Sequence, residues 1–431
     1  MIKNLIIPVL IFLFTATTFG QNSLTLQDSI ANYFREIKQA TKENQNLWNK
    51  DLYGPILLVD PGTKQIYSNE TDAEGLLKPL GQIYSGALLN NLNVANTSVH
   101  WSGKDWAMVM LPLPSDKQDR INLLAHELFH MAQPSLGFFL YNNENNHLDA
   151  KLGRIYLRLE LEALIKAIQS PNITDMKNHL TNAFHFRKYR YLIYPGADSS
   201  ENLLELNEGI AEYTGFIISN RSKEQAVKHF EKSINDFQSN PTFVRSFPYQ
   251  TIPAYGYLLY SAKKDWNKDI NIKTNLADYF IEAFKLYVPD DLEKSIDAIS
   301  SRYDGPEIFA EESEREEKVK QLIAEYRSKF IEQPHFEIRF ENMNVSFDTR
   351  NIMPLEDKGT IYPYIKVIDN WGILTVKNGA LMSSNWDKIT VTPPLKIKDK
   401  TITGDGWTLE LNEGYKVIKE ENNGNYILKK K

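Results

Sequence analysis

Hydrophobic and polar positions follow three different patterns along the 431 residues. Between about residues 50 and 114, short apolar runs such as GPILLVD and WAMVMLPLP are separated by turn signals, which is typical of β-strands. From 115 to about 332 the apolar residues recur with the period of a helix. The expected helices cover 119–133, 149–169, 175–192, 200–219, 223–237, 254–263, 273–287 and 309–331. After Pro334 the pattern returns to short β-type runs between Gly, Asn and Asp turns.

These patterns predict an α+β fold. A mostly helical domain with an N-terminal β-sheet region would cover 21–334, and a C-terminal all-β module would cover 335–431. The WAMVMLPLP run is either an edge strand that could pair with an extended peptide or an ordinary core strand.

The first 20 residues have the pattern of a secretory signal peptide. Lys3 precedes an apolar run from Leu5 to Phe14, and small and polar residues follow up to Gly20. An uncleaved membrane anchor is the alternative, but the run is shorter than the roughly 20 residues that a spanning helix needs. No later segment is long and apolar enough, so we expect an exported protein with no stable membrane insertion after signal removal.

Composition narrows the possible partners and ligands. With 42% hydrophobic and 24% charged residues, the chain has the composition of a folded globular protein. The net charge is −6 and Lys and Arg are scattered, which argues against nucleic acid as a partner. The absence of cysteine leaves His and carboxylates as metal ligands, and it favours a bacterial periplasmic or secreted protein without disulfides.

The stretch LLAHELFHMAQ, residues 123–133, contains a candidate metal motif. On a helix, His126 and His130 lie on the same face, so both imidazoles can reach one ion. Glu127 lies about 100° further round, where a general base acting on water would stand. Ser115 or Asp116 can cap this helix. The alternative is an amphipathic helix whose histidines bind nothing.

A third ligand is expected in SSENLLELNEGIAEYTGF, residues 199–216. Glu201, Glu205, Glu208 and Glu212 recur there along one side of a predicted helix. A solvated acidic face is one explanation. Like charges at this spacing repel by a few tenths of a kcal/mol per pair, however, and the neighbouring apolar residues leave little room for a wide polar face. A bound cation would remove the conflict.

Two other carboxylates compete for the role of third ligand. Glu160 and Glu162 lie in the apolar helix LRLELEALIKA, where an unpaired carboxylate is costly. We expect Arg158 to pair with Glu160 and Arg154 to pair with Glu162, so that these carboxylates stabilise the fold and do not bind the metal.

HELFH followed by LNEGIAEY resembles the gluzincins, the thermolysin-like and aminopeptidase N-like zinc peptidases. The resemblance covers only these two stretches. It implies a gluzincin-like metallopeptidase domain in which His126, His130 and Glu208 hold Zn²⁺ and Glu127 is the general base.

The resemblance also implies supporting residues. Asn207 would support the site, and Glu212 would hydrogen-bond a ligating histidine. The sequence departs from the family in the long separation of about 77 residues between His130 and Glu208, which two predicted helices would fill. The amine-binding signature Gly-x-Met-Glu-Asn is absent upstream of the motif, which favours an endopeptidase over an aminopeptidase.

Zinc hydrolases also need a donor that stabilises the developing oxyanion. Tyr255, in IPAYGYLLY, is the expected residue, with Tyr213, His147 and His185 as alternatives.

The sequence therefore predicts an exported zinc metallopeptidase that acts on a peptide or protein substrate. A non-peptidase or inactive relative that binds a ligand, or a cell-surface binding protein, is the alternative. The sequence does not determine the oligomeric state.

Overall fold

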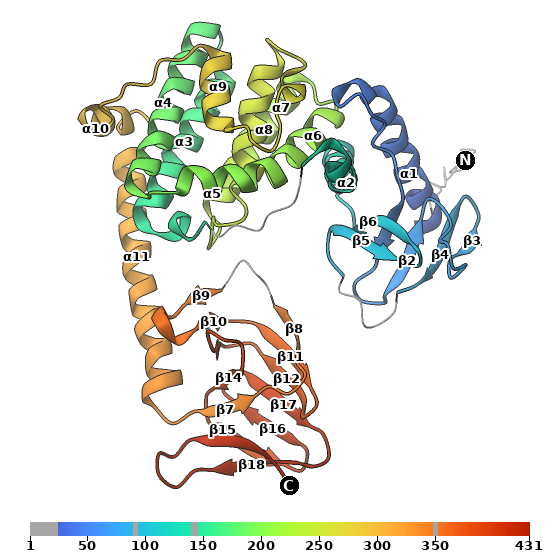
Figure 1. Cartoon of the computed structure of the whole chain (residues 1–431), viewed down its shortest axis with the longest axis vertical. Coiled ribbons are helices and arrows are strands. Elements are labelled where there is room, and N and C mark those ends of the chain that lie inside the picture. Colours follow the sequence, from blue (N-terminus) through green and yellow to red (C-terminus); the bar gives the residue numbers. More distant parts are fainter. Residues whose placement is uncertain (1–24, 89–93, 139–144, 348–351) are drawn as a thin grey trace, which may run out of the picture.

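The structure is a computed structural model that describes residues 25–88, 94–138, 145–347 and 352–431 (Figure 1). The predicted signal peptide over 1–20 lies outside the described residues. The chain has an N-terminal sheet, a helical body and C-terminal β-sheets, so the expected α+β class is confirmed at this level.

The N-terminal part consists of a helix and a six-stranded sheet of order β3-β4-β2-β1-β6-β5. Its elements are α1 (Leu26–Glu43), β1 (Ile56–Val59), β2 (Gln65–Ser68), β3 (Lys78–Leu80), β4 (Ile83–Ala87), β5 (Thr97–Trp101) and β6 (Lys104–Met110). Helix α1 is not among the expected helices. Strand β6 pairs with β1 in parallel and with β5 antiparallel, and its residues Trp106 to Val109 are fully buried. The WAMVMLPLP run is therefore a core strand, and β5 is the edge strand beside it.

The helical body follows the expected periodicity closely. Its helices are α2 (Lys117–Ala132), α3 (Lys151–Gln169), α4 (Ile173–Ile193), α5 (Ala197–Leu204), α6 (Ile210–Ile218), α7 (Lys223–Gln238), α8 (Pro248–Tyr260), α9 (Leu276–Phe284), α10 (Ile296–Ser300) and α11 (Gly305–Arg327). The helix expected over 200–219 is interrupted. A π-helical turn, η4 (Glu205–Gly209), separates α5 from α6. Asp116 caps α2 by accepting from the Asp119 backbone N–H.

The C-terminal module is a sandwich of two sheets, of orders β18-β19-β7-β14-β13-β10-β9 and β15-β16-β17-β12-β11-β8. The strands are β7 (Phe336–Arg339), β8 (Asn344–Phe347), β9 (Met353–Pro354), β10 (Thr360–Tyr362), β11 (Ile365–Asp369), β12 (Gly372–Val376), β13 (Ala380–Met382), β14 (Lys388–Val391), β15 (Pro394–Lys398), β16 (Thr401–Gly404), β17 (Trp407–Leu411), β18 (Tyr415–Lys419) and β19 (Tyr426–Lys430). Both sheets contribute to one core, which includes Phe336, Trp371 and Trp407. The expected all-β character after residue 335 is confirmed.

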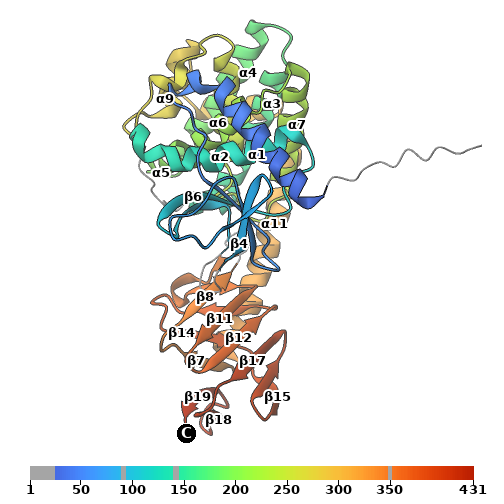
Figure 2. The ribbon, with the colours of Figure 1, turned by 90° about the vertical axis from the view of Figure 1, so that its right-hand side faces the viewer.

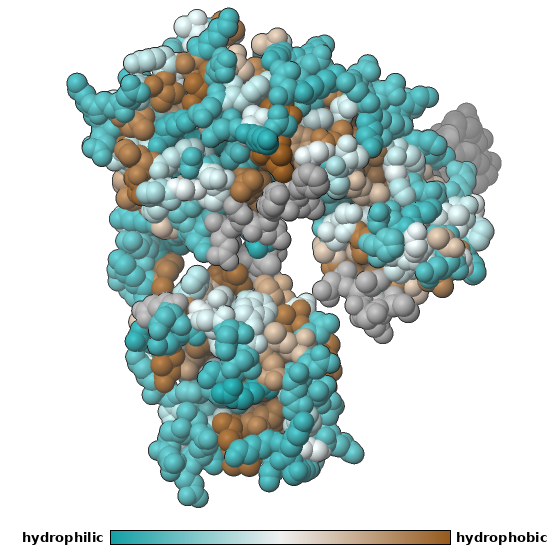
Figure 3. Space-filling model, viewed as in Figure 1, coloured by the Kyte–Doolittle hydropathy of each residue, from teal (hydrophilic) through white to brown (hydrophobic). Residues whose placement is uncertain are grey.

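The β module lies at one end of an elongated molecule, and α11 runs from the helical body to it (Figures 1 and 2). The face in Figure 3 is predominantly hydrophilic. No helix in the described part of the chain has both the length and the apolar character needed to cross a membrane.

Candidate metal centre

Helix α2 places His126 in the interior and His130 beside it in a partly buried position. It packs against β5 and β6 on the sheet side and against α6 on the other side. His126 and Glu127 are only 3% and 4% exposed, so the motif does not lie on a solvent-facing helix surface. Because His126 and His130 are four residues apart, their rings share one face of α2, and their Nε2 atoms lie 2.9 Å apart.

Glu208 reaches the same point from η4. Its Oε2 lies 3.5 Å from the Nε2 of His126 and 3.3 Å from the Nε2 of His130. The close packing of α2 and α6 brings these residues together. It depends on Gly215, where an added Cβ would lie 2.5 Å from the Asn122 carbonyl oxygen. The three side chains can offer one ligand atom each, all within 4.8 Å of one another.

The hydrogen bonds around the histidines assign their protons. The Nδ1 of His126 lies 2.8 Å from the Oε2 of Glu212, and the Nδ1 of His130 lies 2.7 Å from the Oε1 of Gln133. The amide orientation of Gln133 is fixed because its Nε2 donates to the Asn207 carbonyl at 2.7 Å. Both Nδ1 atoms face oxygen acceptors, so the neutral rings carry their protons there and expose lone pairs at Nε2.

This donor set fits a divalent metal. Two imidazole lone pairs and a carboxylate oxygen point at a common position, which is unfavourable unless a cation lies between them. Donors around a tetrahedral zinc ion lie about 3.3 Å apart, since Zn–N and Zn–O bonds are about 2.0–2.2 Å long. The observed separations of 2.9, 3.3 and 3.5 Å are close to that value.

Without a metal, the group attracts a proton. Burial by itself lowers the pKa of His126, but hydrogen bonds to Glu208 and Glu212 outweigh it and raise the pKa to about 10. Burial also raises the pKa of the Glu208 carboxyl, and the two histidines outweigh it and bring that pKa well below its usual range. The centre therefore stabilises a positive charge at the position where Nε2 and Oε2 atoms converge.

Glu127 is a buried carboxyl close to the two histidines. Burial raises the pKa of its carboxyl, and the nearby His126 and His130 partly offset that effect. Its Oε2 is buried and has no hydrogen-bond partner within the described residues. A buried carboxylate oxygen without a partner is costly and is rarely kept for stability alone.

Glu212 and Asn207 lie where the resemblance implies supporting residues. Glu212 accepts a 2.7 Å hydrogen bond from Asn122 Nδ2 in addition to its contact with His126. Asn207 is 6% exposed, and its Nδ2 donates to Glu208 Oε1 at 3.3 Å.

Sequence reasoning missed two residues of the centre. Tyr249, on α8, donates from its hydroxyl to Glu208 Oε2 at 2.6 Å, and its ring stacks on His126 at a centroid distance of 5.4 Å. Gln133 orients His130. The position of Gln133, three residues after His130, could have indicated a contact between these two side chains, because residues at that spacing are neighbours on a helix. Nothing in the local sequence distinguishes Tyr249 among 22 tyrosines.

The structure does not bring Tyr255 to this centre. Tyr255 is fully buried and its hydroxyl donates to Glu160 at 2.8 Å. Of the alternatives, His147 contacts Glu201 and His185 contacts the Leu292 carbonyl. The Tyr213 ring packs against Trp266, at a centroid distance of 4.7 Å.

The competing carboxylates also lie elsewhere, and the arginine partners expected for them are wrong. Glu160 pairs with Arg187 and Arg190 of α4, and Glu162 accepts from Gln238 of α7. Arg154 and Arg158 instead bind Glu312 of α11. The helix packing, and not the spacing within α3, decides these pairs.

Comparisons of the chain with protein-family models, curated proteins and solved structures gave no match. The resemblance to gluzincins therefore rests on the two sequence motifs alone.

Proposed function

We propose that this protein is an exported zinc-dependent metallopeptidase of gluzincin type. The observation that supports this most is the convergence of His126 Nε2, His130 Nε2 and Glu208 Oε2, from helices far apart in sequence, on one position. A Zn²⁺ ion held there would supply Lewis acidity that polarises a carbonyl group and makes water nucleophilic near neutral pH.

Residues of the chain would carry out the proton transfers and stabilise the oxyanion. Glu127 would accept the proton of the attacking water and pass it to the departing amine. Tyr249, whose hydroxyl donates to Glu208 Oε2 in this structure, would turn that donor to the developing oxyanion, in the role that the sequence suggested for Tyr255. Burial raises the pKa of its hydroxyl, so Tyr249 keeps its proton at neutral pH. Glu212 and Gln133 would hold the imidazole rings in the ligating tautomer.

A peptide substrate could lie along the N-terminal sheet. Strand β5 is at the edge of its sheet and packs against α2, the helix of the motif histidines. An extended chain added to that edge would run beside the metal centre. Endopeptidase activity is the form we propose, because the amine-binding signature is absent upstream of the motif.

Metal content and peptide cleavage test the proposal. The purified chain should contain about one zinc per molecule by elemental analysis, and Glu208→Ala should remove it while Glu160→Ala should not. Loss of zinc from the Glu160 variant alone would contradict the ligand assignment. The wild type should cleave internal bonds of a peptide library with blocked termini. A zinc-loaded wild type that cleaves no peptide would favour the ligand-binding alternative.

A further inference from the structure

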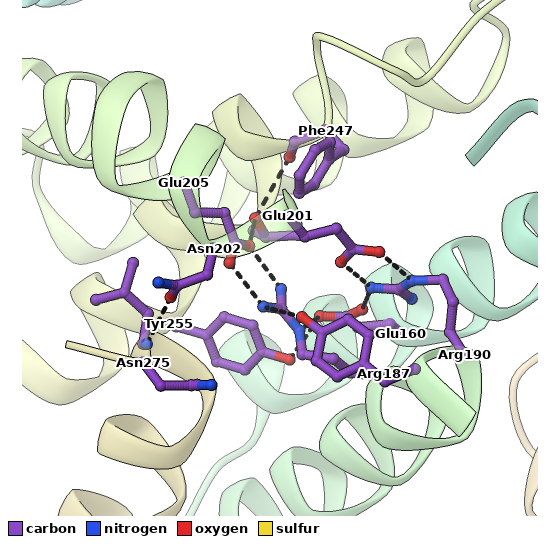
Figure 4. A network of polar contacts seen from close by, with 12 residues as sticks. Glu160, Arg187, Arg190, Glu201, Asn202, Glu205, Phe247, Tyr255 and Asn275 are labelled. Carbon is purple, nitrogen blue, oxygen red and sulfur yellow. Dashed lines mark hydrogen bonds and ion pairs between the residues drawn. The ribbon is translucent and has the colours of Figure 1, made fainter. Parts of the chain in front are cut away.

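A second polar cluster lies deep in the helical body, on α3, α4, α5 and η4 (Figure 4). We call it the arginine cluster. It consists of Glu160, Arg187, Arg190, Glu201 and Glu205, each at most 1% exposed. Three carboxylates meet two guanidinium groups in a region without solvent, so each hydrogen bond there matters.

Arg187 binds Glu205 with both ends of its guanidinium fork. Its two terminal nitrogens donate to the two Glu205 carboxylate oxygens at 2.8 and 2.7 Å, and its Nε donates to Glu160 at 2.7 Å. The hydroxyl of Thr251 donates to Glu205 at 2.6 Å from α8. A bidentate pair fixes direction as well as distance, so Glu205 is locked between α4 and α8.

Glu205 is also the first residue of the π turn η4, which contains the proposed ligand Glu208. A π turn is rare and needs support from its surroundings. Its closing hydrogen bond runs from the Ile210 N–H to the Glu205 carbonyl. Helix α8 packs directly on the turn, since a Cβ at Gly209 would lie 2.6 Å from the Ile252 side chain.

The π turn directs the four glutamates of residues 199–216 to two different sets of partners. In an unbroken α-helix the four glutamates would share one side. A π turn holds more residues than an α turn, so the side chains after it are rotated relative to those before it. Glu201 and Glu205 accordingly contact arginines of α4, whereas Glu208 and Glu212 contact histidines of α2.

We propose that Arg187, acting through Glu205, is a positioning residue of the metal centre, because it holds the π turn in the conformation that directs Glu208 toward His126 and His130. The proposal rests on the proposed function in that it requires a metal at this centre. Loosening the turn should weaken metal binding about tenfold, at the low end of the effect of outer-shell substitutions on metal affinity.

The test measures metal binding in Glu205→Gln and Thr251→Val. Zinc affinity is obtained by competition with a chromophoric chelator, and the ligand geometry from the absorption spectrum of the Co²⁺-loaded protein. We expect about tenfold weaker zinc binding and altered Co²⁺ bands for Glu205→Gln. Thr251→Val, which removes only one hydroxyl donor, should change both in the same direction but less.

Glu201→Gln is the matched control. Glu201 is equally buried, belongs to the same cluster and binds Arg190, but within the described residues its carboxylate is bonded to Arg190 and His147 and to no side chain of η4. This variant should lose stability while its zinc affinity stays within about twofold of wild type and its Co²⁺ spectrum is unchanged.

Three outcomes would overturn the inference. One is wild-type affinity and spectrum in Glu205→Gln, or in Thr251→Val if the first variant does not fold. A second is an equal loss of affinity in Glu201→Gln, which would indicate general destabilisation. A wild type that binds neither Zn²⁺ nor Co²⁺ would overturn this inference together with the proposed function, whereas the other two results leave the proposed function intact.

Discussion

The candidate metal centre and the arginine cluster share one row of four glutamates but differ in their partners. Arginine carries a permanent positive charge and several donors, so Glu201 and Glu205 are neutralised by the protein itself. The rings of His126 and His130 are neutral when their protons lie on Nδ1, and they add lone pairs to the charge of Glu208. Buried acidic side chains thus indicate a metal only where the opposing residues bring no charge of their own.

The largest expected effect is a loss of catalytic rate in Glu127→Gln without a loss of metal binding. Glu127→Gln should lower kcat for the proposed peptide cleavage by about 10²–10⁴-fold, because the proposed general base is lost. Zinc content should be unchanged, since Glu127 is not among the ligand atoms that converge. Steady-state cleavage assays measure the change in kcat, and elemental analysis measures the zinc content. Full activity of the variant would rule out Glu127 as the base.

In the arginine cluster, Arg190→Met should cost about 3–5 kcal/mol of unfolding free energy, because it leaves three buried carboxylates with Arg187 as their one guanidinium partner. Urea denaturation of the metal-free proteins measures this. Lys232→Met, which removes an exposed ion pair with Asp236, is the control and should leave the unfolding free energy nearly unchanged. Equal effects of the two substitutions would mean that the arginine cluster is not a stability element.

The pH dependence of the unfolding free energy should show the contribution of the Glu201 carboxylate. Burial alone raises the pKa of its carboxyl, but Arg190 outweighs it and lowers the pKa to about 2, from the usual value of 4.5. The folded value lies below the unfolded one, so the carboxylate stabilises the fold above pH 4.5, and this contribution is lost as the pH falls toward 2. It amounts to about 3 kcal/mol, at about 1.4 kcal/mol per pKa unit.

Urea midpoints of wild type and Glu201→Gln, compared between pH 7 and pH 3, measure this contribution. The difference in stability between the two proteins should shrink steadily below pH 4.5. A difference that is constant across that range would mean that Glu201 is not held ionised by Arg190.

The smallest effect concerns Glu212, the hydrogen-bond partner of His126. Glu212→Gln keeps the shape of the side chain but removes its charge, and should weaken zinc binding about 10–100-fold. Glu36→Gln is the control. It removes a carboxylate of α1 that pairs with Arg120. Arg120 lies on α2, as the motif does, but outside the motif, so zinc affinity should not change. Chelator competition measures both, and unchanged affinity in the Glu212 variant would argue against its ring-orienting role.

Much of the helical body is predictable from the chain because helical periodicity and capping are local. The helix containing the motif was expected over 119–133 and begins at Lys117 after the Asp116 cap. The spacing of His126 and His130 alone places them on one face. The interruption at η4 was not predictable, since a π turn depends on the packing of α8 and the pairing of Glu205 with Arg187.

The sequence by itself determined the order of the β and α parts and the pair of histidines with its adjacent glutamate, because these depend on residues within a few turns of one another. Only the tertiary structure decided that Glu208 faces that pair while Glu160 and Glu201 face arginines, and that Tyr249 replaces Tyr255 at the centre. Those choices follow from which helices pack together, and close packing is set by contacts between residues 40 to 90 positions apart.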